Sequence, residues 1–231
     1  DLYIQNHLAV AIQERRIEAW YQPVVCASSG RCVAVEVLAR WHDLELGWIG
    51  PATFIPMAEN LGLIQQLGDQ VWQASLAAGN DWRRQGHPLL LSVNISKRQL
   101  FHDGFTQKLL ADLAQHQLAP DSIILEVTES LALLDVENAA DRLAELKRAG
   151  FHLAIDDFGT GYSSLSQLHE MPVDELKIDI SFVRRLNDSR GLSMVQAIIS
   201  LATTLGLKTV AEGVEDEPCA QKLRTLGVDF L

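Results

Sequence analysis

The chain has 231 residues, a formal net charge of −11 and a hydrophobic fraction of 48%. The length predicts one domain over residues 1–231, since a single α/β barrel of roughly 200 to 250 residues is ordinary. The negative charge argues against binding to long nucleic acid, which relies on Lys and Arg to neutralise phosphates. It does not exclude a small phosphate ester, because bound metal can reverse the local charge.

Short apolar strands alternate with amphipathic helices, which is typical of a parallel α/β sheet or barrel. Ile4, Leu8 and Ile12 give an opening helix one apolar stripe. Two strands are predicted next, over 20–26 and 32–40. Their short Ser-Ser-Gly link makes the pair antiparallel, because a parallel pair requires a long crossover.

A regular alternation follows to the end of the chain. Helices are predicted over 53–67, 69–85, 104–116, 136–149, 193–205 and 218–226. Strands are predicted over 89–96, 123–129, 151–158, 175–182 and 208–214, and one more begins at 228. The expected fold is therefore a TIM-like (β/α)8 barrel whose first strand is antiparallel to the next.

The three cysteines form no C-x-x-C motif, and their odd number gives no complete disulfide framework. We expect buried free thiols, as in a reducing cytoplasm. No apolar run approaches the ~20 residues of a membrane helix, and no signal peptide is visible. The start at Asp1 indicates a fragment of a longer chain.

Polar side chains stand near the carboxyl ends of six predicted strands, although a strand buried on both faces should be apolar. They are Glu36 and Arg40; Ser92, Asn94 and Ser96; Glu126 and Thr128; Asp156 and Asp157; Lys177 and Asp179; and Glu212. Active sites of such barrels lie where strands end. Carboxylate and amide oxygens suit Mg²⁺ or Mn²⁺, whereas no Cys/His set for zinc is present. Buried salt bridges, for instance between Glu126 and Lys177, are the alternative.

These residues fall in motifs that resemble EAL-domain cyclic di-GMP phosphodiesterases. The signature is Glu36-Val37-Leu38-Ala39-Arg40, and the run DDFGTGYSS over 156–164 is the most specific match. Further matches are Tyr21-Gln22-Pro23, Phe54 to Glu59, Asn94-Ile95-Ser96, Leu125 to Ser130, Lys177-Ile178-Asp179 and Ala211 to Glu215. The resemblance covers essentially the whole chain. Val37 stands where the family usually has Ala, and we expect it to be tolerated because its side chain points to the opposite face from Glu36 and Leu38.

The resemblance implies hydrolysis of cyclic di-GMP to linear pGpG with two Mg²⁺ or Mn²⁺ ions. One ion would be held by Glu36, Asn94, Glu126 and Asp156, and the second by Asp156, Asp157 and Glu212. The catalytic set would be Lys177, which orients or activates the attacking water, with Asp179 nearby and Glu212. Arg40 would bind a substrate phosphate and the backbone near Leu38 would touch the ligand. Glu129 would pin the loop over 158–164, and Glu215 would support the second metal.

The family normally continues past Leu231 into a Gln-Gly-Tyr segment, so the C-terminal end of the barrel is expected to be truncated. The resemblance also implies a cytoplasmic domain, with sensory or cyclase domains in the full-length protein, which can be membrane-anchored. As in similar domains, a homodimer is expected. Two other functions stay open. One is a catalytically silent receptor that binds cyclic di-GMP, and the other is a metal-dependent phosphoesterase with another substrate.

Overall fold

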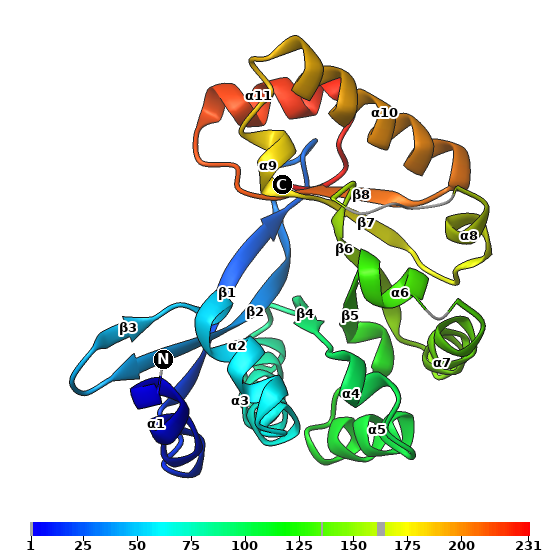
Figure 1. The fold of residues 1–231 in the computed structure, drawn as a ribbon. Helices are drawn as coiled ribbons and strands as arrows, with labels where there is room; N and C mark the ends of the chain where they lie inside the picture. The colour runs from blue at the N-terminus through cyan, green and yellow to red at the C-terminus, as the bar shows by residue number, and fades with distance from the viewer. Residues whose placement is uncertain (1, 135, 161–164) are drawn as a thin grey trace.

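The computed structural model describes residues 2–134, 136–160 and 165–231. Within them, eight strands form one sheet in the order β1-β2-β4-β5-β6-β7-β8, and β3 pairs with β2. Figure 1 shows this sheet curled through the molecule, with helices along its outer side.

The strands are β1 (Ile17–Val25), β2 (Cys32–Asp43), β3 (Gly47–Ile49), β4 (Leu90–Asn94), β5 (Ile123–Thr128), β6 (His152–Phe158), β7 (Glu175–Ile178) and β8 (Lys208–Ala211). The helices are α1 (Leu2–Gln13), α2 (Pro51–Asn60), α3 (Ile64–Arg84), α4 (Lys97–Leu100), α5 (Phe105–Gln115), α6 (Glu129–Leu134), α7 (Val136–Arg148), α8 (Leu165–Glu170), α9 (Ile180–Val183), α10 (Ser189–Leu205) and α11 (Glu217–Leu226), with a 3₁₀ turn at Pro120–Ser122.

The pairing of the strands confirms the predicted fold class. β1 is antiparallel to β2. β2 is parallel to β4, and each later pair of neighbours, from β4 and β5 to β7 and β8, is also parallel. Phe230 forms bridges to both Cys26 and Val210. Val25 and Leu231 exchange two backbone hydrogen bonds of 2.8 and 2.9 Å. The last residues therefore join β8 to β1 and complete the curl of the sheet.

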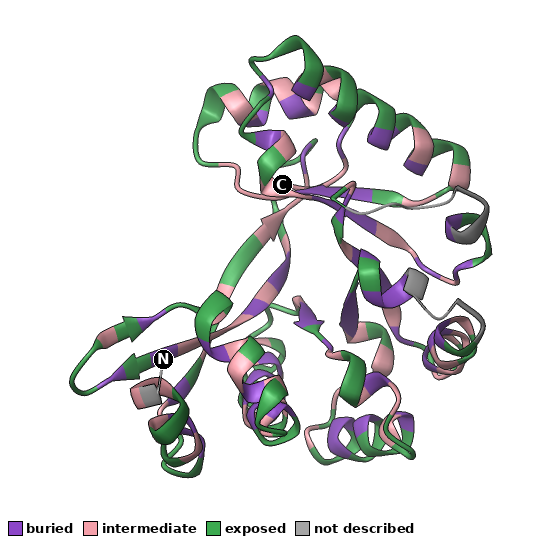
Figure 2. Cartoon of the chain, in the orientation of Figure 1, coloured by how far each residue is buried: buried purple, intermediate pink, exposed green. Residues whose placement is uncertain are grey.

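Alternation along the strands produces two layers of side chains. The face toward the helices is filled by branched apolar residues of one large core, among them Val35, Leu91, Val127 and Ile155. The concave face carries a small apolar cluster of Ala34, Ile124 and Ala154, and polar residues lie beyond it toward the carboxyl ends of the strands. Figure 2 shows the buried residues concentrated on the strands and on the inner sides of the helices.

Several predicted boundaries were wrong. The strand predicted over 175–182 ends at Ile178, because Asp179 caps α9 by accepting a hydrogen bond of 3.0 Å from the Ser181 backbone N–H. Neither β3 nor α6 was predicted, since three and six residues are too few to establish a period. All three cysteines are free as expected, but none is buried, because Cys26 and Cys219 are half-buried and Cys32 is exposed.

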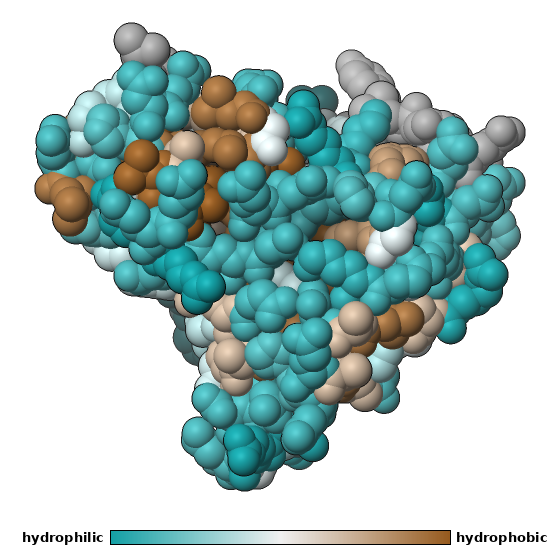
Figure 3. Space-filling view, turned by 90° about the horizontal axis from the view of Figure 1, so that it is seen from below, coloured by the Kyte–Doolittle hydropathy of each residue, from teal (hydrophilic) through white to brown (hydrophobic). Residues whose placement is uncertain are grey.

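The face of the molecule seen in Figure 3 is mostly hydrophilic, and hydrophobic residues form separate patches on it. Among the described residues, none of the helices combines the length and hydrophobicity that a bilayer span demands.

One carboxylate of the concave face predicts a pH-dependent stability. Glu175 pairs with Ala154 and Lys208 across the sheet, and burial, followed by the charge of Asp174, raises its pKa from 4.5 to about 7. Because the folded state binds this proton more tightly, the associated stability is present below pH 4.5 and is lost as the pH rises through 7. We expect Glu175→Gln to raise the free energy of unfolding by about 1 to 2 kcal/mol at pH 8 and to change it little at pH 4.5.

Urea denaturation at the two pH values checks this expectation, with Glu170→Gln on the exposed side of α8 as the control. A gain of equal size at both pH values would show that the charge of Glu175 is not its cause.

Candidate active site

The ammonium of Lys177 on β7 lies among four carboxylates. Its Nζ is 3.4 Å from Glu36 Oε1, 2.8 Å from Glu126 Oε2, 3.1 Å from Asp156 Oδ1 and 2.7 Å from Glu212 Oε1. These acids come from β2, β5, β6 and the residue after β8, so the structure brings together side chains that are far apart in the sequence. The salt bridge between Glu126 and Lys177 does form, but three further acids share the same cation. An ammonium has only three N–H donors and cannot satisfy four carboxylates.

Neighbouring polar side chains hold the acids in place. Ser92 Oγ donates a hydrogen bond of 2.5 Å to Glu126 Oε1, and Asn94 Nδ2 donates one of 3.4 Å to Glu36 Oε1. The Lys177 and Glu126 side chains are only 4% and 2% exposed, whereas Glu212 keeps 23%. The cluster is therefore closed at its base and open to solvent on the side of Glu212.

Asp156 and Asp157 are adjacent in sequence, so in a regular strand their side chains would point to opposite faces. The pairing of β6 with β7 is irregular between Ile155 and Phe158, and Asp157 has a φ of 55°. This left-handed conformation is uncommon outside glycine, although Asp and Asn adopt it more readily than most residues. As a result, Asp156, Asp157 and Glu212 each place one carboxylate oxygen within 4.8 Å of the others.

The pKa shifts in the cluster show that the chain itself does not balance the negative charge of these acids. Burial raises the pKa of Glu126 to about 8 and that of Glu212 to about 7, against the opposing effect of Lys177. Burial and the charge of Asp156 raise the pKa of Asp157. Burial alone would lower the pKa of Lys177, but the surrounding acids, Glu126 first, raise it well above its ordinary value.

The donor set fits divalent cations. With all groups ionised, the five carboxylates and the single ammonium leave four negative charges uncompensated, which is the charge that two divalent ions would balance. Every candidate ligand offers an oxygen atom, including the amide of Asn94, and Mg²⁺ and Mn²⁺ prefer oxygen. The cluster can therefore hold metal beside a substrate that carries negative charge.

The residues predicted to support the cluster, Glu129, Asp179 and Glu215, differ in the contacts that they make. Glu129 Oε2 accepts a hydrogen bond of 2.9 Å from the Gly159 backbone N–H at the start of the predicted loop, while 161–164 lie outside the described residues. Asp179 accepts hydrogen bonds from Ser181 and, after Asp156, contributes its charge to the raised pKa of Asp157. Glu215 is exposed and pairs with Arg184 at 3.4 Å rather than joining the acids.

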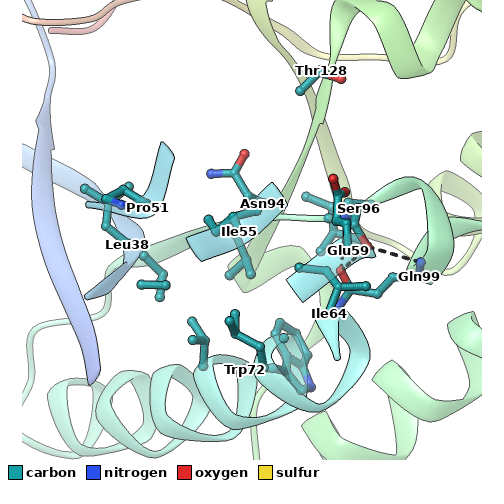
Figure 4. Close-up of a pocket in the computed structure, with 18 of the residues that line it drawn as sticks. Leu38, Pro51, Ile55, Glu59, Ile64, Trp72, Asn94, Ser96, Gln99 and Thr128 are labelled. Atoms are coloured by element: carbon teal, nitrogen blue, oxygen red, sulfur yellow. Dashed lines mark hydrogen bonds between the residues drawn. The ribbon is translucent and has the colours of Figure 1, made fainter. Parts of the chain in front are cut away.

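A cavity of about 510 Å³ opens beside the acids, between β2, β4, α2 and α3. Leu38, Arg40, Asn94 and Asp156 line it, so both predicted substrate-binding residues border the cluster. Figure 4 shows Leu38 and Pro51 at one side, Asn94 and Ile55 near the middle and Trp72 of α3 below them. The sequence alone assigned no site role to Pro51, Ile55 or Trp72, because apolar helix residues that line a cavity have the same spacing as those of a core.

Comparison with known proteins identifies the family. The family model described as EAL domain matches residues 5–231. The chain belongs to the EAL domain family. It is 40% identical over 233 residues to a protein of Pseudomonas aeruginosa named bifunctional diguanylate cyclase/cyclic di-GMP phosphodiesterase MucR, covering 100% of this chain and 34% of MucR. It is 38% identical to the probable cyclic di-GMP phosphodiesterase PdeB of Escherichia coli, covering 97% of this chain and 43% of PdeB.

The EAL domain also matches solved structures along its length. The MucR phosphodiesterase in complex with c-di-GMP has a TM-score of 0.95 and 40% identity, and covers 99% of this chain and 94% of that one. The EAL enzyme Bd1971 in its form bound to cAMP and cyclic di-GMP has a TM-score of 0.92 and 33% identity, over 99% of this chain and 63% of that one. The chain spans less than half the length of MucR and PdeB.

Proposed function

We propose that this EAL domain is a metal-dependent phosphodiesterase that hydrolyses cyclic di-GMP to linear pGpG. The observation that carries the proposal is the convergence of Glu36, Glu126, Asp156 and Glu212 on one ammonium, beside a cavity lined by Arg40. The names of the MucR and PdeB relatives and the ligand of the MucR structure support the choice of substrate. Mg²⁺ and Mn²⁺ are the proposed ions because all candidate ligands are oxygen atoms.

The candidate ligands are Glu36, Asn94, Glu126 and Asp156 for one ion and Asp156, Asp157 and Glu212 for the other. When bound, such ions supply positive charge to the phosphodiester and lower the pKa of an attacking water. The chain contributes the buried ammonium of Lys177, which donates hydrogen bonds and can orient that water, and the guanidinium of Arg40, which can bind a phosphate oxygen. Attack of water on one phosphorus breaks its P–O3′ bond, and the 3′ oxygen takes up a proton as the ring opens to pGpG.

The proposal is tested by incubating the domain with cyclic di-GMP and Mg²⁺ or Mn²⁺ and separating the nucleotides by chromatography. We expect pGpG to accumulate with either ion and to disappear in excess chelator. A panel that includes cyclic di-AMP and a linear phosphodiester decides whether another substrate is preferred. Intact cyclic di-GMP after prolonged incubation with both ions would contradict the proposal.

The receptor alternative predicts a different pair of results. Calorimetry would then show tight binding of cyclic di-GMP in chelator, and chromatography would show no turnover in metal. The retained set of acids and Lys177 favours hydrolysis, because a receptor has no need for a cluster with so many uncompensated charges. Other expectations stay predictions: the homodimer, the additional sensory or cyclase domains, the cytoplasmic location and the supporting role of Glu215.

A further inference from the structure

Two exposed tryptophans meet over the strand that carries Arg40. Trp41 pairs with Ile17 of β1 and with Ile49 of β3, so β1 and β3 lie on opposite edges of β2. Trp20 of β1 stands opposite Leu38, and Trp48 of β3 stands opposite His42. Their ring centroids are nevertheless only 5.2 Å apart at an interplanar angle of 76°. Cross-strand partners share a face, so both indoles lie on the face of β2 that carries Leu38 and His42. On that face Arg40 is the residue between Leu38 and His42, and the two indoles therefore meet across β2 at the level of Arg40.

These rings do not belong to the hydrophobic core, since Trp20 and Trp48 are 48% and 56% exposed. Glu36 and Leu38 of the candidate active site lie on the same face of β2 as Arg40, because every second side chain of a strand points to the same face. The aromatic pair is therefore continuous with the site along one strand.

The carboxylate that lies opposite Arg40 on the neighbouring strand is hydrogen-bonded to another residue. Glu18 is the cross-strand partner of Arg40, and opposite charges in that arrangement ordinarily attract each other. Instead, Trp20 Nε1 donates a hydrogen bond of 3.0 Å to Glu18 Oε2, while Arg40 Nη1 donates one of 3.0 Å to the Ala39 carbonyl oxygen. In the described part of the chain, no carboxylate lies within ion-pair distance of Arg40. The guanidinium is left able to bind an anion in the adjoining cavity, which Arg40 helps to line.

We propose that Trp20 is a positioning residue for Arg40. Its indole N–H holds the Glu18 carboxylate, and its ring closes the space above β2 together with Trp48, so that Glu18 does not capture the guanidinium. This inference rests on the proposed function, in which Arg40 binds a phosphate of cyclic di-GMP.

The critical variant is Trp20→Phe, which keeps an aromatic ring but removes the N–H donor. We expect KM for cyclic di-GMP to rise about two- to fivefold, or about 0.4 to 1 kcal/mol, which is the scale of an exposed ion pair, with kcat changed less than about twofold. In the double variant Trp20→Phe with Glu18→Gln, the competing charge is gone and KM should return to the value of Glu18→Gln alone. Trp82→Phe on α3 is the matched control, and thermal unfolding verifies that each variant is folded.

Two results would overturn the inference: an unchanged KM in Trp20→Phe, or a double variant as impaired as Trp20→Phe, since that loss would come from packing and not from charge. If the wild type binds without turnover, dissociation constants from calorimetry replace KM in the same comparison. A wild type that neither binds nor cleaves cyclic di-GMP contradicts the proposed function as well. Normal wild-type turnover with an unaffected Trp20→Phe contradicts only the role of Trp20.

Discussion

Replacing Asp156 with Ala is expected to lower kcat for cyclic di-GMP by at least about 10³-fold, or about 4 kcal/mol of transition-state stabilisation. Asp156 lies 3.1 Å from Lys177 Nζ and also contributes an oxygen to the group formed with Asp157 and Glu212. It is therefore the candidate ligand for both ions, and its loss removes a charge that each ion would require. Glu36→Ala, which removes a ligand of one ion, should also abolish turnover.

Chromatographic measurement of pGpG formation checks this expectation, and calorimetric titration with Mn²⁺ reports metal binding independently of activity. Asp156→Asn keeps the volume of the side chain and should show the same loss, because the charge is what the cation requires. Asp141→Ala on the exposed side of α7 is the control for removing an acid elsewhere. Near-native rates in Asp156→Ala would show that the ligand assignment is wrong.

Replacing Lys177 with Met is expected to affect both catalysis and stability. The rate should fall about 10²- to 10³-fold while the dissociation constant for cyclic di-GMP changes less than about threefold, because the ammonium is proposed to act on the water and not on the substrate. Without metal, four carboxylates lose the cation that they share, and we expect the free energy of unfolding to fall by about 3 to 5 kcal/mol.

Urea denaturation with and without Mg²⁺ separates the two effects. Divalent ions should stabilise the Lys177→Met variant more than the wild type, since they become the main source of positive charge in the cluster. Equal stabilisation of both proteins would contradict the idea that lysine and metal compensate the same acids. A variant that loses substrate affinity in parallel with rate would instead place Lys177 in substrate binding.

Much of the fold could be predicted because its signals are local. The alternation of apolar strands with amphipathic helices indicated the barrel, and the short link between 26 and 32 required an antiparallel first pair. The end of β7 was not predictable from apolar pattern alone, since Ile180 and Phe182 continue it. There the Asp179 side chain accepts a hydrogen bond from the Ser181 backbone N–H in the first turn of α9, and the strand ends.

The candidate site was only partly predictable for a related reason. Polar residues at strand ends indicated convergence, and alternation placed Glu36 beside Leu38 and Arg40. Alternation alone would have turned Asp157 away from Asp156, and only the irregular pairing of β6 and the left-handed backbone bring both to one side. The shared geometry around Lys177 depends on distances between strands that no pattern within one strand can specify.

The candidate ligands are also distributed from β2 near the beginning of the chain to the residue after β8 near its end. Contacts between such distant segments form late, because the loop between them must close before they gain any energy. A refolding chain could thus regain most of its helical circular dichroism while still unable to bind metal. Recovery of activity would then follow the slowest assembly step of the sheet, and enzymatic assay would report completion of the native topology more faithfully than any measure of secondary structure.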